Sequence, residues 1–225
     1  MRELELAHQL RAALGRSHLD TTIRLINQGA APDTITKSGL TPLRVAIEAQ
    51  RLDAVRALLD LGADPDANEI VTHAATAGHA AILSALLSAG ADPTPALLPT
   101  AMLGRWDIVE LLIAAGAIPD GEVLYCAVQE TDEDMVALLL RSGADPNTYT
   151  REHGWTPLHL AARYGYTDTA RLLIAAGCDT DALTRSGSTP LEIAIKNRRY
   201  DVIDLLDPTR TIADELAAKH GHPRA

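Results

Sequence analysis

The chain has 225 residues, of which 47% are hydrophobic and 3% aromatic, and it contains no Phe. Its interior must therefore be built from Leu, Ile, Val and Ala, a composition that favours closely packed helices. A net charge of −10 has the wrong sign for a protein that binds phosphate backbones, so we expect no nucleic acid partner.

The first residues and the apolar runs argue against secretion and membrane insertion. Residues 1–5 read Met-Arg-Glu-Leu-Glu, without the basic and then apolar run of a secretory signal, and no run of 18 apolar residues occurs. We therefore expect a cytoplasmic protein without a membrane partner. Arg far outnumbers Lys and Ala is abundant, a usage that hints at a bacterial gene.

The cysteines and histidines do not predict a metal centre. Cys126 and Cys178 lie far apart without a CxxC motif, which favours two reduced, buried thiols over a disulfide or a zinc site. His220 and His222 form a close pair that lacks further ligands in a fixed register. We expect neither a metal nor a cofactor.

A glycine-led turn recurs along the chain and predicts the end of a helix each time. The glycine follows an apolar stretch, and in most copies an Asp-Pro pair or a near variant of it comes next. A left-handed glycine caps a helix, and proline cannot continue one. The turns begin at Gly29, Gly62, Gly90, Gly116, Gly143 and Gly177.

Helix starts and a leucine column complete the repeat. Thr41-Pro42, Thr156-Pro157 and Thr189-Pro190 each place a capping hydroxyl before a proline at the first helical position. A leucine stands at a constant distance before each turn, which predicts one core layer per unit and seven units in all. The column is Leu25, Leu58, Leu86, Leu112, Leu139, Leu173 and Leu206.

Residues 156–177, which run from Thr-Pro-Leu-His-Leu-Ala-Ala-Arg-Tyr-Gly to Leu-Leu-Ile-Ala-Ala-Gly, resemble an ankyrin repeat almost position for position. The resemblance covers nearly the whole chain and is best at residues 33–63 and 147–207. It implies an all-α solenoid of about seven helix pairs, joined by short β-hairpin-like fingers that line a concave groove with the first helices. It also implies that His159 is a structural histidine that holds the Thr-Pro turn.

The spacing of the turns predicts the extent of each unit. The turn spacing shortens in the middle of the chain, so the middle fingers should be truncated, and polar residues at the start suggest a cap. Residues 211–225 supply an N-cap, an acidic first turn and apolar spacing, which predict a final capping helix and a tail. The ankyrin repeat domain spans 1–210, with an N-terminal cap at about 1–32 and units at about 33–63, 64–91, 92–117, 118–144, 145–178 and 179–210.

Met102 and Leu103 are the first candidate binding residues along the chain. They stand at the end of a first helix, at a position that is polar in most other units, where the family resemblance implies exposure to the groove. Two apolar side chains at such a place indicate an interaction surface. The alternative is that a neighbouring unit covers Met102 where the fingers are short.

Acidic residues gather in the next unit. Residues 116–146 hold seven carboxylates and one arginine, and an acidic ridge is expected at Asp132, Glu133 and Asp134, with Glu130 at the end of the first helix. Most charge runs are solvated faces, yet such a ridge can steer a basic partner into place.

The aromatic residues cluster in the unit that follows. Tyr149, Trp155, Tyr164 and Tyr166 fall within eighteen positions, and Trp155 and Tyr164 occupy places that face the groove in ankyrin proteins, where we expect neither to be core. Arg163 lies beside Tyr164 and should set the polar register of a bound partner.

These observations predict a non-catalytic module that binds another protein, which could be basic, in its concave groove. No GxSxG, HExxH or glycine-rich phosphate loop suggests an enzyme. Two alternatives stay open: an acidic inhibitor or immunity protein that neutralises a basic toxin or nuclease, and a binder of a small molecule or modified residue through an aromatic box.

Overall fold

The computed structural model describes residues 5, 9–10, 12–13, 18–35, 39–66, 69–150 and 152–207. Within these ranges the regular structure is helical and contains no strand, which confirms the predicted all-α class. The chain divides into two compact units, Met1–Ala117 and Ile118–Ala225, and each is described here by itself. The capping helix expected at 211–225 lies outside the described residues.

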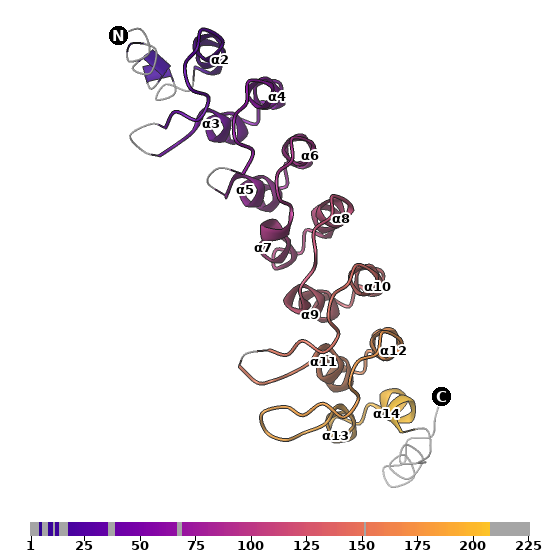
Figure 1. Cartoon of the computed structure of the whole chain (residues 1–225). Coiled ribbons are helices and arrows are strands. Elements are labelled where there is room, and N and C mark those ends of the chain that lie inside the picture. Colours follow the sequence, from indigo (N-terminus) through magenta and orange to yellow (C-terminus); the bar gives the residue numbers. More distant parts are fainter. Residues whose placement is uncertain are drawn as a thin grey trace. The chain divides into compact units, whose positions relative to one another are not determined.

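The first unit consists of consecutive helix pairs (Figure 1). Each pair packs its two helices on each other, and the second helices of neighbouring pairs, such as α2 with α4 and α4 with α6, are in contact. The helices are α2 (Leu19–Asn27), α3 (Pro42–Glu48), α4 (Leu52–Asp60), α5 (Ile70–Ala77), α6 (Ala80–Ser88), the 3₁₀ turn η2 (Thr94–Ala96), α7 (Leu97–Ala101) and α8 (Trp106–Ala114).

The second unit repeats this arrangement with two rows of helices, which Figure 1 shows for this unit. The first helices α9, α11 and α13 contact one another in succession, and so do the second helices α10, α12 and α14. The bounds are α9 (Gly121–Glu130), α10 (Glu133–Arg141), α11 (Pro157–Tyr164), α12 (Thr167–Ala175), α13 (Pro190–Lys196) and α14 (Tyr200–Leu206).

The threonine–proline pairs begin helices as predicted. The Thr41 hydroxyl accepts a hydrogen bond from the backbone N–H of Arg44 at 3.2 Å, and Thr156 and Thr189 do the same within capping boxes. Each proline occupies the first helical position, where its missing N–H group costs nothing. Local chemistry thus determines where these helices start.

Helix ends and the core also follow the repeat. All six turn glycines have φ between 83° and 103°, in the left-handed region that glycine tolerates. The leucine column is buried from Leu25 to Leu173, while Leu206 is half-buried against the last core layer. One leucine per pair therefore fills the space between neighbouring helix pairs.

The connections between pairs differ in length as predicted. Residues 142–150 with 152–156, and residues 176–189, belong to two long, hairpin-like fingers (Figure 1), whereas residues 115–120 make a short link before α9. The fingers close on themselves through the backbone bonds from Thr150 N–H to the Trp155 carbonyl and from Thr184 N–H to the Ser188 carbonyl, at 2.8 and 3.0 Å. A bond of 3.1 Å from Arg185 N–H to the His153 carbonyl joins the two fingers.

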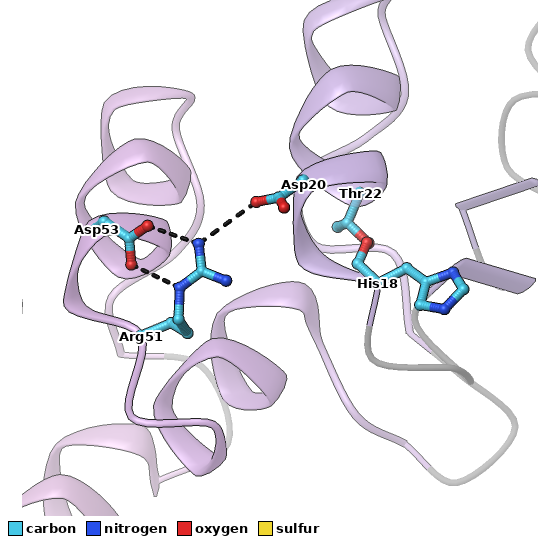
Figure 2. Close-up of polar contacts among 5 residues, drawn as sticks. All are labelled: His18, Asp20, Thr22, Arg51 and Asp53. Carbon is cyan, nitrogen blue, oxygen red and sulfur yellow. Dashed lines mark hydrogen bonds and ion pairs between the residues drawn. The ribbon is translucent and has the colours of Figure 1, made fainter.

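An arginine at the start of α4 ties two neighbouring pairs of the first unit together. The Arg51 guanidinium makes hydrogen bonds of 2.6 and 2.8 Å to the carboxylate of Asp53, and one of 3.4 Å to Asp20 on α2 (Figure 2). The hydrogen bonds from Arg51 lower the pKa of Asp53 to about 2.

None of the described helices has both the length and the apolar character that a membrane-spanning helix requires.

Candidate functional site

The turn between α11 and α12 positions most of the predicted aromatic residues. Helix α11 ends at Tyr164, Gly165 follows with φ 85°, and Tyr166 is the residue before α12 begins. The left-handed glycine reverses the chain within one residue. It therefore brings Tyr164 and Tyr166 to the same edge of the second unit, beside Arg163 in the last turn of α11.

Four of the predicted residues form one continuous cluster, which we call the Arg163 cluster: Trp155, Arg163, Tyr164 and Tyr166. The Cζ atom of Arg163 lies 5.3 Å from the centre of the Trp155 ring and 5.5 Å from that of Tyr164. The Tyr164 and Tyr166 rings stack with their centres 5.6 Å apart and their planes at 19°. The structure thus brings together side chains that the sequence placed only in the same unit.

This arrangement does not form an aromatic box around an empty centre. The chain's own Arg163 guanidinium lies against both Trp155 and Tyr164, at the place a bound cation would take. Tyr166 stacks on the next ring along. The rings are therefore strung in a row, and the small-molecule alternative has no support in their geometry.

Trp155 corrects one expectation from the sequence. Its ring is half-buried and packs against the last core layer of the second unit, and its centre lies 6.2 Å from the His159 ring. Trp155 is therefore partly a core residue, because it stands at the base of its finger, directly before the N-cap of α11, where its side chain packs on residues of α13 and α14. Tyr164, by contrast, is 47% exposed, as predicted. The core layer consists of Ala162, Ile193, Ala194, Val202 and Ile203.

Tyr125 on α9 is a neighbour of the Arg163 cluster, and the sequence analysis did not predict it. Burial raises the pKa of its phenol, Tyr164 raises this pKa further and Arg163 lowers it, so Tyr125 lies close to both residues. Tyr125 stands one helical turn before Gln129, which aligns with Arg163, so helical spacing could have indicated it.

Tyr149 lies apart from the other aromatic residues. It is on the first long finger and is 67% exposed, and among the described residues its ring contacts no other ring. Leu183, which occupies the matching position on the second finger, is 63% exposed. The fingers therefore present apolar side chains of their own, separate from the Arg163 cluster.

The acidic ridge lies at the turn between α9 and α10. Glu130, Asp132, Glu133 and Asp134 line a shallow hollow of about 440 Å³. The carboxylate of Asp132 accepts a hydrogen bond from the backbone N–H of Met135 at 2.9 Å, and so it caps α10. Asp132 therefore has a structural role, and the other three carboxylates are exposed around it.

Met102 and Leu103 belong to the first unit, at the turn between α7 and α8. Their side chains are 71% and 59% exposed, so no neighbouring residue described in the structure covers them. They form an exposed apolar pair, as the sequence predicted. Their place in a common surface with the Arg163 cluster stays a prediction.

The two thiols are half-buried, and His159 is part of the core. Burial raises the pKa of the Cys178 thiol to about 11 and also raises that of Cys126. His159 is buried, its Nδ1 accepts a hydrogen bond of 3.1 Å from Thr156 N–H, and its Nε2 donates to the Ser188 carbonyl at 3.1 Å. In the described residues no three His, Cys, Asp or Glu side chains gather as metal ligands would.

Comparisons with known proteins agree with this architecture. A family model described as "Ankyrin repeats (3 copies)" matches residues 9–69 and 124–212, together more than half of the chain. The chain is 29% identical over 187 residues to the glycerophosphocholine phosphodiesterase gde1 of Schizosaccharomyces pombe. That match covers 80% of the chain but only 15% of the relative, so the chain corresponds to a small part of that enzyme.

Two solved structures are similar over most of their length. The ankyrin repeat domain of Bcl-3, of the IkappaB protein family, has a TM-score of 0.68 and 28% identity, with 88% of this chain and 96% of that chain covered. An ankyrin repeat domain from Acinetobacter baumannii has a TM-score of 0.64 and 30% identity, with coverage of 76% and 99%.

Proposed function

The chain belongs to the ankyrin repeat family, whose domains are in general protein–protein interaction modules, and we propose that it is a non-catalytic module that binds a partner protein through the Arg163 cluster. The partner packs on Tyr164 and Tyr166, with Trp155 and Arg163 beside them. Glu130 and the finger residue Tyr149 are candidate contacts at the edge of this surface.

The observation that carries the proposal is a stacked tyrosine pair next to an arginine, in which Tyr164 is exposed and Tyr166 is half-buried. Trp, Tyr and Arg are the residues that dominate binding energy in protein interfaces, because they combine a large apolar area with polar atoms. Tyr164 keeps 47% of its surface exposed although it stacks on Tyr166. The pair is already ordered, so a partner would lose little side-chain entropy on docking there.

Met102 and Leu103 are proposed as a second contact of the same partner. Both are large apolar side chains at a turn, and no residue in the described ranges covers either of them. Burial of such side chains at an interface contributes roughly 25 cal/mol for each Å² of apolar surface removed from water. Met102→Ser with Leu103→Ser should therefore weaken binding without unfolding the first unit.

The test compares partner capture by three purified forms of the chain. The Tyr164→Ala, Tyr166→Ala double variant should lose the partner, whereas Ile118→Ala should retain it, because Ile118 is 71% exposed but outside the proposed surface. With the purified partner, the double variant should bind about 30-fold more weakly, which corresponds to about 2 kcal/mol. A partner held equally by the wild type and the double variant would refute this site.

A second candidate is an acidic inhibitor of a basic protein, supported by the exposed carboxylates around the hollow of about 440 Å³. Replacement of Glu130, Glu133 and Asp134 by their amides tests it, because Asp132, which caps α10, is left intact. Steering by exposed charges is strongly screened by salt. This candidate would be excluded if the triple variant bound the basic partner as tightly as the wild type, and if the affinity stayed unchanged from about 50 to 500 mM salt.

A further inference from the structure

We propose that Arg163 binds a carboxylate of the partner, so that the segment that docks on the Arg163 cluster is acidic. This inference rests on the proposed function, since it assigns the chemistry of the partner at the same surface. It differs from the acidic-inhibitor candidate, which requires a basic partner at the turn between α9 and α10.

The first observation is that the Arg163 side chain is held in place without a counter-ion from any residue that the structure describes. Its guanidinium lies over the Trp155 and Tyr164 rings at 5.3 and 5.5 Å, and the residue is exposed. Among the described residues, no side-chain or backbone oxygen accepts a hydrogen bond from this guanidinium, and no carboxylate forms an ion pair with it. Glu130, the acidic residue at the end of the neighbouring helix α9, makes no such pair either.

The second observation concerns the unused donors. A guanidinium carries five N–H donors, and the contacts of Arg163 with the two rings take up none of them in a hydrogen bond to an oxygen of a described residue. Packing on Trp155 and Tyr164 therefore orients Arg163 but leaves its N–H edges available. A planar carboxylate matches two parallel N–H groups and forms a bidentate, charge-assisted pair.

The third observation is the charge of the neighbouring helix. Lys196 ends α13 at the position that corresponds to Arg163, and it is also exposed. Arg199 follows closely, and its Nε donates a hydrogen bond to the Arg163 backbone carbonyl at 2.9 Å. The ends of α11 and α13 thus present three cationic side chains in adjacent helix pairs, and an acidic segment is the complementary partner.

Ordering of the arginine before binding adds to its value as an anchor. A free arginine loses rotamer entropy when it pairs with a carboxylate, and this loss makes most exposed ion pairs weak. The stacked rings have already restricted Arg163. The same pair therefore forms at a lower entropic cost than on an open surface.

Display selection on the full chain provides the test, with a library of random 12-residue peptides as the probe. Selected peptides should be enriched in Asp and Glu relative to the unselected library. Arg163→Gln should weaken their binding on the order of tenfold or more, because a charged hydrogen-bonded pair is lost. Arg171→Gln is the matched control, because Arg171 is an exposed arginine of α12 that pairs with Asp168 at 3.8 Å.

A double-mutant cycle locates the carboxylate. Changing the anchoring Asp or Glu of a selected peptide to its amide should weaken binding to the wild type but not to Arg163→Gln. Arg163→Lys should restore only part of the affinity, since an ammonium lacks the planar fork. Circular dichroism of each variant verifies that the helices remain folded.

The outcomes separate this inference from the proposed function. Peptides that depend on Tyr164 and Tyr166 but bind Arg163→Gln as tightly as the wild type overturn the carboxylate pairing alone. Enrichment in Lys and Arg overturns it as well, and favours the acidic ridge. Binders that are indifferent to the Tyr164→Ala, Tyr166→Ala variant, or a selection that yields no binder, contradict the proposed surface and the inference with it.

Discussion

Gly165 lies directly against the Arg199 side chain: a Cβ atom added at Gly165 would be 2.9 Å from the Cδ of Arg199. The two residues come from neighbouring helix pairs, and the close approach lets Arg199 reach the carbonyl oxygen of Arg163. A glycine is required at this turn for two reasons, its left-handed φ and the space that Arg199 occupies.

Gly165→Ala should therefore destabilise the protein more than a glycine replacement that causes backbone strain alone. Gly177→Ala is the matched control, because Gly177 has φ 83° and no atom within 4 Å of the added Cβ. The control should cost about 1 kcal/mol of unfolding free energy, and Gly165→Ala about 1 kcal/mol more. Urea denaturation measures both, and equal costs would show that Arg199 moves aside freely.

Thr131→Gly should stabilise the protein. Thr131 occupies the turn position that Gly165 holds in the next pair, and it adopts φ 59° and ψ 30°, a left-handed conformation that a β-branched residue disfavours. Relief of this strain should raise the unfolding free energy by roughly 1 kcal/mol, measured by urea or thermal denaturation. Thr131→Val keeps the β-branch and should give no gain. A glycine variant no more stable than the wild type would contradict this account.

Trp155→Ala and Tyr164→Ala should separate folding from binding. Trp155 packs on the last core layer, so its truncation should lower the unfolding free energy by roughly 2 kcal/mol. Tyr164 is 47% exposed, and its truncation should cost less than about 1 kcal/mol while it weakens partner binding. Thermal denaturation compares the stability of the two variants. If Tyr164→Ala were as unstable as Trp155→Ala, Tyr164 would be a core residue and not mainly a binding residue.

His159 should make the protein less stable in mild acid. Burial lowers the pKa of His159 below its ordinary value of 6.5, so the unfolded chain binds the proton more readily than the folded one. The contribution of the neutral imidazole is complete above pH 6.5 and is lost as the pH falls below it. Protonation would also remove the Nδ1 acceptor that holds Thr156 N–H.

The measurement is the unfolding free energy of the wild type and His159→Leu at pH 7.5 and 5.5. The variant should be less stable than the wild type at pH 7.5 by about 1 to 3 kcal/mol, because Thr156 N–H and the Ser188 carbonyl lose their partners. The difference should shrink at pH 5.5. A difference that stays constant or widens with acid would show that His159 does not carry this pH dependence.

Much of the fold could be predicted because the signals are local. A threonine before a proline caps a helix with its own hydroxyl, as Thr156 does, and a glycine in the left-handed region ends one, as Gly143 does. These interactions span only a few residues, so the repeat and its shortened fingers could be predicted from the sequence alone. The exposure of Met102 and Tyr164 followed from the same register.

The candidate site was predicted in its residues but not in its contacts. Proximity in sequence placed Trp155, Arg163 and Tyr164 in one unit, yet nothing in the sequence showed that Arg163 lies against both rings. Tyr125 was missed because it comes from the preceding helix pair and approaches Tyr164 only when α9 and α11 pack together.

The amino-acid sequence alone determined the helix boundaries, the core leucines and the family of this protein, because each depends on backbone preferences and on a period of about thirty residues. Only the tertiary structure decided that Trp155 is partly core and that no carboxylate of the described residues pairs with Arg163. Both depend on side chains of different helix pairs that meet at a distance in sequence, as Arg163 and Arg199 do. Such contacts are set by packing between helices, which no local pattern encodes.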